Sequence, residues 1–154
     1  MFDPDQYSMF GRDAISPKDA QQGGLGDCWM VAASSAVASD PERIKKIFLT
    51  QTLNSAGVYA LQFYLLGVPV TVSVDEQLPF KTDWKGDYRT IYGAPGVDGS
   101  LWFPILEKAA AKMYGNYEML SGGWMGPAVQ MLTGAPYYET KHNPSVPESI
   151  VDSF

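Results

Sequence analysis

The chain has 154 residues, of which 45% are hydrophobic and 18% are charged, and its formal net charge is −6. This length and composition indicate one globular domain over residues 1–154 and exclude a disordered chain. The acidic balance argues against a nucleic-acid partner, and no apolar run approaches the ~18 residues of a membrane span.

The first half of the chain predicts an irregular segment followed by two helices. Residues 1–26 contain several glycines and show no periodicity. Residues 27–39 contain neither proline nor glycine, and their apolar side chains recur at helical spacing. A second helix is expected over residues 41–49, because Asp40 can cap its start and Pro41 suits its first position.

The middle of the chain predicts a β-hairpin and a long loop. Apolar and polar residues alternate over residues 57–75 on both sides of Gly67, which is typical of two antiparallel strands. Pro69 favours an edge position, because it cannot donate to a strand ladder. Residues 79–99 are rich in glycine, proline and aspartate and are expected to form a long ordered loop facing substrate.

Two further helices are expected in the last third. One follows Ser100 with an apolar face and ends near Gly115, and a short one over residues 127–132 stops at Gly134. Residues 147–154 resemble the opening turns of another helix. We therefore expect the chain to be a fragment of a longer protein.

Cys28 is the residue with the clearest chemical potential. It follows a glycine-rich approach and opens a predicted helix, where unpaired N–H groups favour a thiolate over a thiol. A thiolate is a nucleophile, and the Gln22 amide together with the Cys28 N–H could stabilise an oxyanion. Two alternatives stay open on these residues alone, a small buried hydrophobic cysteine and a redox-sensing thiol. As the single cysteine it forms no internal disulfide, which favours a reducing, cytoplasmic location.

Three segments of the chain carry a resemblance to a known family. They are QGGLGDCW at residues 22–29, VYALQFYLLGVPVTVSVDEQLPF at residues 58–80 and LWFPILEKAAAKMYGNYEMLSGG at residues 101–123. In this order they resemble the calpains, which are papain-like intracellular cysteine proteases. The resemblance covers roughly residues 19–150.

The resemblance implies a fold and a set of site residues. The fold would be α+β, the N-terminal lobe of a papain-like cysteine protease, with a central Cys-bearing helix, packed helices and a small antiparallel sheet. Cys28 would be the nucleophile of a calpain-type endopeptidase, and Gln22 would be the oxyanion donor. Gly122 and Gly123 would bind an extended substrate peptide through their main-chain groups, whereas Trp29 would be a core aromatic residue.

The resemblance also implies that a second lobe is missing. Calpains activate the cysteine with a His and an Asn from a second lobe, and this chain is similar only to the first. His142, the single histidine, lies in a context typical of a surface turn, so we do not expect it to act as the base. The isolated lobe should therefore be inactive. The alternative is a non-catalytic calpain-like scaffold or peptide-binding module.

Calcium is the last implication of the resemblance. No cofactor is required for the chemistry, but calpain lobes bind calcium as an activator. Asp19 matches the family's calcium aspartate, whereas Ser100 stands where the family has a glutamate. Asp98 lies two residues from Ser100 and is the expected substitute.

Overall fold

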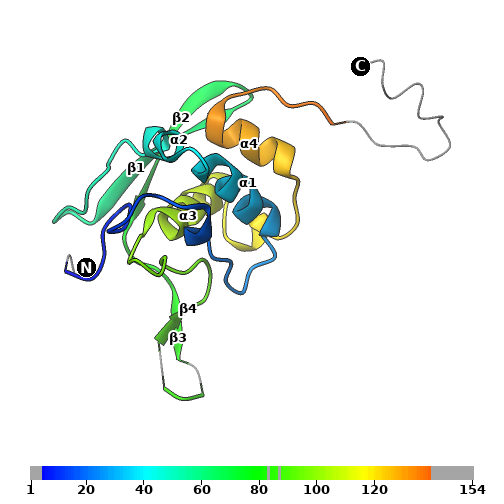
Figure 1. The fold of residues 1–154 in the computed structure, drawn as a ribbon. Helices are drawn as coiled ribbons and strands as arrows, with labels where there is room; N and C mark the ends of the chain where they lie inside the picture. Colours follow the sequence, from blue (N-terminus) through cyan, green and yellow to red (C-terminus); the bar gives the residue numbers. More distant parts are fainter. Residues whose placement is uncertain (1–4, 83, 87, 140–154) are drawn as a thin grey trace.

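Four α-helices and two separate antiparallel strand pairs make up the described part of the chain (Figure 1). The structure is a computed structural model that describes residues 5–82, 84–86 and 88–139. In chain order the elements are the 3-10 turn η1 (Pro17–Asp19), α1 (Cys28–Ala38), α2 (Pro41–Ile47), β1 (Val58–Leu65), β2 (Val68–Asp75), β3 (Phe80–Thr82), β4 (Tyr88–Thr90), α3 (Trp102–Tyr114), the 3-10 turn η2 (Glu118–Leu120) and α4 (Met125–Thr133). The α+β prediction is confirmed.

The predicted hairpin is formed by β1 and β2. The strands pair antiparallel from Val58 opposite Asp75 to Leu65 opposite Val68. Period-two alternation sends one face of each strand into the core and leaves the other in solvent, as the burial of Tyr59, Leu61 and Phe63 shows. The core face ends before the turn, where Leu65 is 55% exposed.

The two predicted helices after residue 26 are confirmed. The Asp40 carboxylate accepts a hydrogen bond from the Glu42 N–H at 3.2 Å and so caps α2, as its sequence position predicts. The buried face of α1 carries Trp29, Met30, Ala33, Ser34, Val37 and Ala38, whereas Ala36 is exposed.

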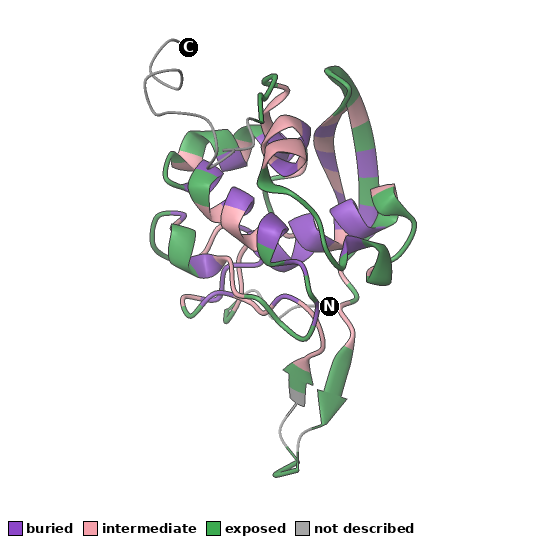
Figure 2. Ribbon diagram, turned by 90° about the vertical axis from the view of Figure 1, so that its right-hand side faces the viewer, coloured by how far each residue is buried: buried purple, intermediate pink, exposed green. Residues whose placement is uncertain are grey.

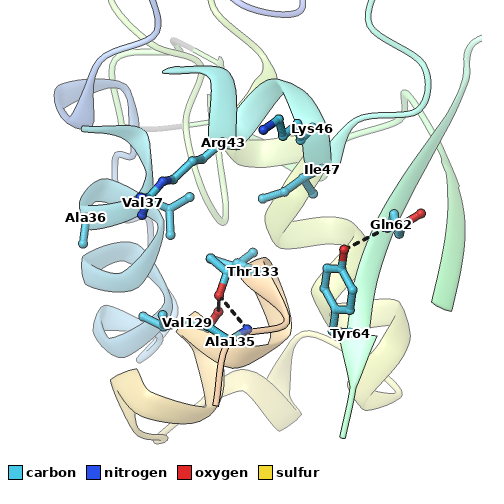
Figure 3. A pocket seen from close by; sticks show the side chains of 11 residues that line it. Ala36, Val37, Arg43, Lys46, Ile47, Gln62, Tyr64, Val129, Thr133 and Ala135 are labelled. Atoms are coloured by element: carbon cyan, nitrogen blue, oxygen red, sulfur yellow. Dashed lines mark hydrogen bonds between the residues drawn. The ribbon is translucent and has the colours of Figure 1, made fainter. Parts of the chain in front are cut away.

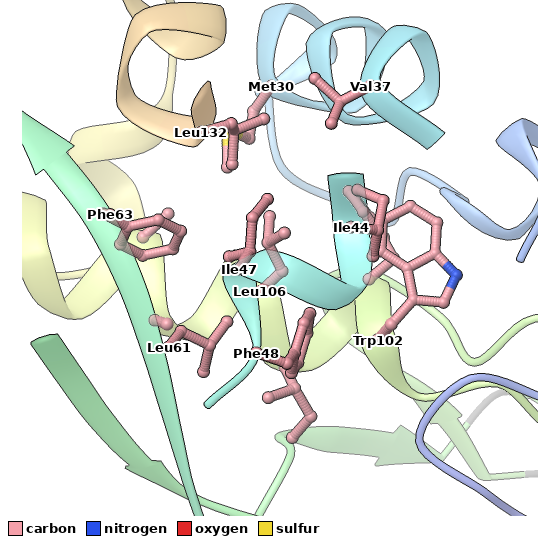
Figure 4. Packing of buried hydrophobic residues seen from close by; sticks show 14 of the residues in the cluster. Met30, Val37, Ile44, Ile47, Phe48, Leu61, Phe63, Trp102, Leu106 and Leu132 are labelled. Atoms are coloured by element: carbon pink, nitrogen blue, oxygen red, sulfur yellow. The ribbon is translucent and has the colours of Figure 1, made fainter. Parts of the chain in front are cut away.

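The core forms where the helices meet the inner face of β1 (Figure 4). α1 packs against α2 and α4, and α3 packs against β1 and β2. Figure 2 shows α3 as a largely buried helix. Its buried side chains include one carboxylate and are Trp102, Phe103, Pro104, Ile105, Leu106, Glu107, Ala109, Ala110 and Ala111. The helix that carries Cys28 is thus held in place by neighbours on several sides.

The long loop expected over residues 79–99 contains a second small hairpin that the prediction missed. β3 and β4 pair antiparallel from Phe80 opposite Thr90 to Thr82 opposite Tyr88. The hairpin projects from the body of the molecule (Figures 1 and 2), and all three residues of β3 are exposed. Without a buried face, the strands leave no alternating apolar pattern in the sequence.

The last described helix, α4, agrees with the short helix predicted over residues 127–132. α4 begins at Met125, two residues before the predicted start, and ends at Gly134, whose φ of 74° is the left-handed conformation that glycine adopts easily. His142 and the helix expected over residues 147–154 lie outside the described residues. None of the described helices is long and apolar enough to cross a bilayer.

Candidate active site

Cys28 is the first residue of α1, and it is exposed. The next two residues of the helix, Trp29 and Met30, are buried, so the thiol lies where the helix emerges from the core. A helix start carries partial positive charge and unpaired N–H groups, which favour a negatively charged sulfur. Among the described residues, no acceptor takes a hydrogen bond from the Cys28 N–H. This N–H is free to bind a ligand.

The glycine-rich approach to Cys28 is fixed by the segment around residue 92. The Gly24 N–H donates to the Ile91 carbonyl at 2.8 Å, and the Ala94 N–H donates to the Gln21 carbonyl at 3.2 Å. A Cβ on Gly23 would come within 2.0 Å of the Tyr92 carbonyl oxygen, so no larger residue fits there without a shift. Internal packing therefore explains why glycine is required at this point.

The Gln22 side chain lies along the turn that leads into Cys28. Its Nε2 donates to the Leu25 carbonyl at 2.7 Å, and the residue is exposed. A side-chain amide has two N–H donors, so this bond leaves one for another acceptor. The structure thus anchors the amide beside the helix start, and the oxyanion role of Gln22 stays a prediction.

Residues 120–123 lie beside the residues that flank Cys28. The Gly122 N–H donates to the Gly26 carbonyl at 2.9 Å, and Trp29 Nε1 donates to the Leu120 carbonyl at 2.8 Å. The structure therefore brings together two regions almost a hundred residues apart in the chain. This placement supports the predicted substrate contact of Gly122 and Gly123 without testing it.

A pair of buried carboxyl groups lies directly beneath the start of α1, and sequence analysis did not identify it. Asp27, which precedes Cys28, is 0% exposed, and Glu107 of α3 is 1% exposed. The two side chains lie close enough to hydrogen-bond when one of them is protonated. Burial, followed by the hydrogen bond with Asp27, raises the pKa of Glu107 to about 8. Burial also raises the pKa of Asp27, an effect that Glu107 and Gln22 partly offset.

One signal in the sequence could have identified Glu107. It is the charged residue among the nine buried residues of α3, and the other eight are apolar. A charged side chain is rarely fully buried unless it is paired. Asp27 gave no such signal, because an aspartate before a helix usually serves as an exposed cap.

One hollow in the described part of the chain lies away from Cys28. Its volume is about 490 Å³, and Figure 3 shows its lining side chains from α1, α2, β1 and α4. Ala36 and Val37 line it near the end of α1 opposite Cys28, about 12 Å along the helix at 1.5 Å per residue. Chemistry at Cys28 therefore does not use this hollow.

The residues predicted to bind calcium are brought together around Gly96. A Cβ on Gly96 would contact the Ser100 hydroxyl, the Asp98 carboxylate and the Asp19 side chain. One Asp19 oxygen, Oδ2, accepts from the Ser16 N–H at 2.8 Å and from Trp102 Nε1 at 3.3 Å. The Ser100 hydroxyl is buried and has no hydrogen-bond partner. Within the described residues, no three Asp, Glu, His or Cys side chains converge as a metal site.

Comparison with known proteins finds the same family over nearly all of the chain. Residues 3–153 match the family model described as "Calpain family cysteine protease". The chain is 37% identical over 121 residues to the "Calpain-type cysteine protease DEK1" of Zea mays, which covers 79% of this chain and 5% of that protein. It is 38% identical over 131 residues to the "Calpain-2 catalytic subunit" of Homo sapiens, which covers 82% of this chain and 18% of that subunit. The chain thus spans less than a fifth of the length of these relatives.

Proposed function

Because the chain belongs to the calpain family of cysteine proteases, we propose that it is the nucleophile-bearing part of a calpain-type endopeptidase. The observation that supports this most strongly is the exposed Cys28 thiol at the first turn of an otherwise packed helix. A cysteine with only a structural role would be buried among apolar side chains. The exposure of Cys28 therefore favours a reactive role.

The proposed reaction begins with attack of the Cys28 thiolate on a peptide carbonyl. A bond forms between sulfur and the carbonyl carbon, and the negative charge moves to the oxygen, where the Cys28 N–H and the Gln22 amide stabilise it. The C–N bond then breaks, and the amine leaves with a proton. Water hydrolyses the resulting thioester, which releases the acid product and restores the thiol.

The proton transfers require residues beyond those described here. We propose that a second lobe supplies the His that deprotonates Cys28 and the Asn that orients the His. General-base catalysis contributes about 10²–10⁴ in rate, so the chain by itself should turn over peptides very slowly. The substrates would be cytoplasmic proteins whose exposed segments bind in extended form beside Gly122 and Gly123.

Calcium binding at Asp19, Asp98 and Ser100 is a separate proposal. The convergence of these residues around Gly96 and the unpartnered Ser100 hydroxyl support it. Two carboxylates supply few of the 6–8 oxygens that calcium takes, so main-chain carbonyls and water would complete the shell. With this low ligand charge we expect millimolar affinity. Calcium when bound would hold the loop that precedes Cys28, and no chemical step depends on it.

A non-catalytic calpain-like scaffold or peptide-binding module is the second candidate. The placement of residues 120–123 beside the helix start supports peptide binding as well as catalysis. The two functions differ in whether they need the Cys28 sulfur. Catalysis needs it as the nucleophile, whereas a scaffold would bind peptide equally well in Cys28→Ser.

Peptide hydrolysis by the completed core separates the two candidates. The chain would be combined with the second lobe of a calpain catalytic subunit, and cleavage of an unfolded protein substrate would be followed by mass spectrometry. We expect cleavage that is lost in Cys28→Ser. Peptide binding without cleavage, unchanged in Cys28→Ser, would favour the scaffold.

A further inference from the structure

The carboxyl pair beneath Cys28 has no positively charged partner. Among the described residues, no salt bridge includes Asp27 or Glu107. Three of the four carboxylate oxygens, both of Asp27 and Oε1 of Glu107, are buried without a protein donor. The fourth, Glu107 Oε2, accepts from the Gly93 N–H at 2.8 Å. Two ionised carboxylates in this setting would repel each other in a region of low dielectric constant.

One proton on the pair removes the repulsion between the two carboxylates. Ionised carboxylates only accept hydrogen bonds, so two of them cannot bond to each other. When one carboxyl keeps its proton, it donates to the other, and the pair carries one negative charge instead of two. Besides burial, which raises the pKa of both groups, a hydrogen bond of this kind between Asp27 and Glu107 raises the pKa of Glu107 and acts to lower that of Asp27.

The pair explains an unusual feature of the start of α1. Asp27 occupies the cap position, where an aspartate normally accepts hydrogen bonds from the first N–H groups of the helix. Its side chain makes no such bond here, because it points into the core toward Glu107. The Cys28 N–H is therefore left for a ligand, whereas the Met30 N–H donates to the Asp27 main-chain carbonyl at 2.8 Å.

We propose that Asp27 and Glu107 share one proton and act as positioning residues for the first turn of α1, where they hold the Cys28 thiol and N–H in place. This inference rests on the proposed role of Cys28 as a nucleophile. Glu107 belongs to a helix with nine buried residues, so the pair ties the reactive turn to the core. The shared proton also keeps a second negative charge away from the thiolate.

Two tyrosines and one further carboxylate lie near the pair. Tyr92 and Tyr117 stack with ring centroids 3.8 Å apart, and burial raises the pKa of both phenols, followed by the charge of Glu118 for Tyr92 and that of Glu107 for Tyr117. The Gln22 amide faces Asp27. Within the described part of the chain, no Lys or Arg forms a salt bridge with the pair. When the pair loses its proton, these described residues therefore leave the added negative charge without an ion-pair partner.

Carbon NMR titration of the side-chain carboxyls, together with Cys28 alkylation, tests this proposal. Cys28 is the single cysteine, so iodoacetamide uptake reports on it alone. We expect the pair to keep one proton through neutral pH and to release it near pH 8. In Glu107→Gln, which keeps the hydrogen bond but cannot ionise, alkylation at about pH 9 should be roughly three- to tenfold faster than in the wild type. Glu139→Gln, a change at an exposed carboxylate, should follow the wild type.

Two results would overturn the proposal. One is that both carboxyls lose their protons in the ordinary acidic range. The other is a pH profile of alkylation in Glu107→Gln that superimposes on that of the wild type. If Glu107→Gln does not fold, Asp27→Asn tests the same proton, and the wild-type titration needs no variant. Failed peptide hydrolysis with an intact proton-sharing pair would count against the protease function and leave the pair established.

Discussion

Gly123 lies against the indole ring of Trp29, so close that a Cβ on Gly123 would come within 2.4 Å of a ring carbon. Trp29 follows Cys28 directly, and its Nε1 donates to the Leu120 carbonyl. The two contacts join the start of α1 to residues 120–123. Packing against Trp29 therefore explains why glycine is needed at position 123.

We expect Gly123→Ala to destabilise the fold through this contact. The added methyl group displaces the indole, at a cost of roughly 1–3 kcal/mol. Gly122→Ala is the matched control, because a Cβ there meets open space and only the φ of 77° is unfavourable, at about 1 kcal/mol. Urea denaturation measures both. Equal losses in the two variants would contradict the packing explanation.

The pH dependence of stability should reveal the raised pKa of Glu107. The folded state keeps this proton up to about pH 8, whereas the unfolded chain releases it near the ordinary value of 4.5. The stabilising contribution is therefore complete below about pH 4.5 and falls as the pH rises to about 8, by about 1 kcal/mol per pH unit.

Urea denaturation at a series of pH values measures this slope. We expect Glu107→Gln to flatten it and to be more stable than the wild type above about pH 8. Glu139→Gln should retain the wild-type slope. A wild-type stability that does not change across this window would show that Glu107 is ionised in the folded protein.

The contribution of Asp75 to the pH dependence of stability should have the opposite sign to that of Glu107 and should be much smaller. A hydrogen bond from Lys108 Nζ at 2.6 Å, followed by one from the Gln77 N–H, lowers the pKa of Asp75. Its contribution is present above the ordinary carboxyl range and is lost as the pH falls through the lowered value. The Asp75 side chain is 59% exposed, so we expect Asp75→Asn to cost less than about 1 kcal/mol at neutral pH. A loss several times larger would mean that this contact between β2 and α3 is not screened by solvent.

Calorimetric titration with calcium tests the proposed site around Gly96. We expect binding heat only at millimolar calcium, because two carboxylates and one hydroxyl form a weak donor set. Asp98→Asn should remove this heat while it leaves the bonds from Ser16 and Trp102 to Asp19 intact. No heat at millimolar calcium, or heat unchanged in Asp98→Asn, would remove calcium from the account.

The sequence predicted the elements that bury an apolar face. The alternation of Tyr59, Leu61 and Phe63 and the absence of proline and glycine over residues 27–39 reflect packing that the structure confirms. The β3–β4 hairpin was missed because its side chains cover no core. Hydrophobic periodicity reflects burial, so a strand whose side chains are exposed is hard to predict from the sequence.

Only part of the candidate site was predictable, because a local sequence pattern does not show contacts between distant residues. Cys28 and Gln22 lie within one short motif, whereas the contact of Asp27 with Glu107 joins residues distant in the chain. An Asp before a helix has an ordinary explanation as a cap, so nothing local indicates that it turns inward. Only the folded structure, which brings Glu107 of α3 to Asp27, reveals the pair.

Labelling of Cys28 by a peptidyl epoxide is the most direct measurement of the central claim that this thiol is a nucleophile placed to attack a bound peptide. The chain is combined with the second lobe of a calpain catalytic subunit, mass spectrometry locates the adduct on Cys28, and the rate is compared with that of free cysteine at the same pH. We predict a rate that saturates with epoxide concentration, exceeds that of free cysteine by about tenfold or more and falls in Gln22→Ala. A rate no higher than that of free cysteine, without saturation, would contradict the account.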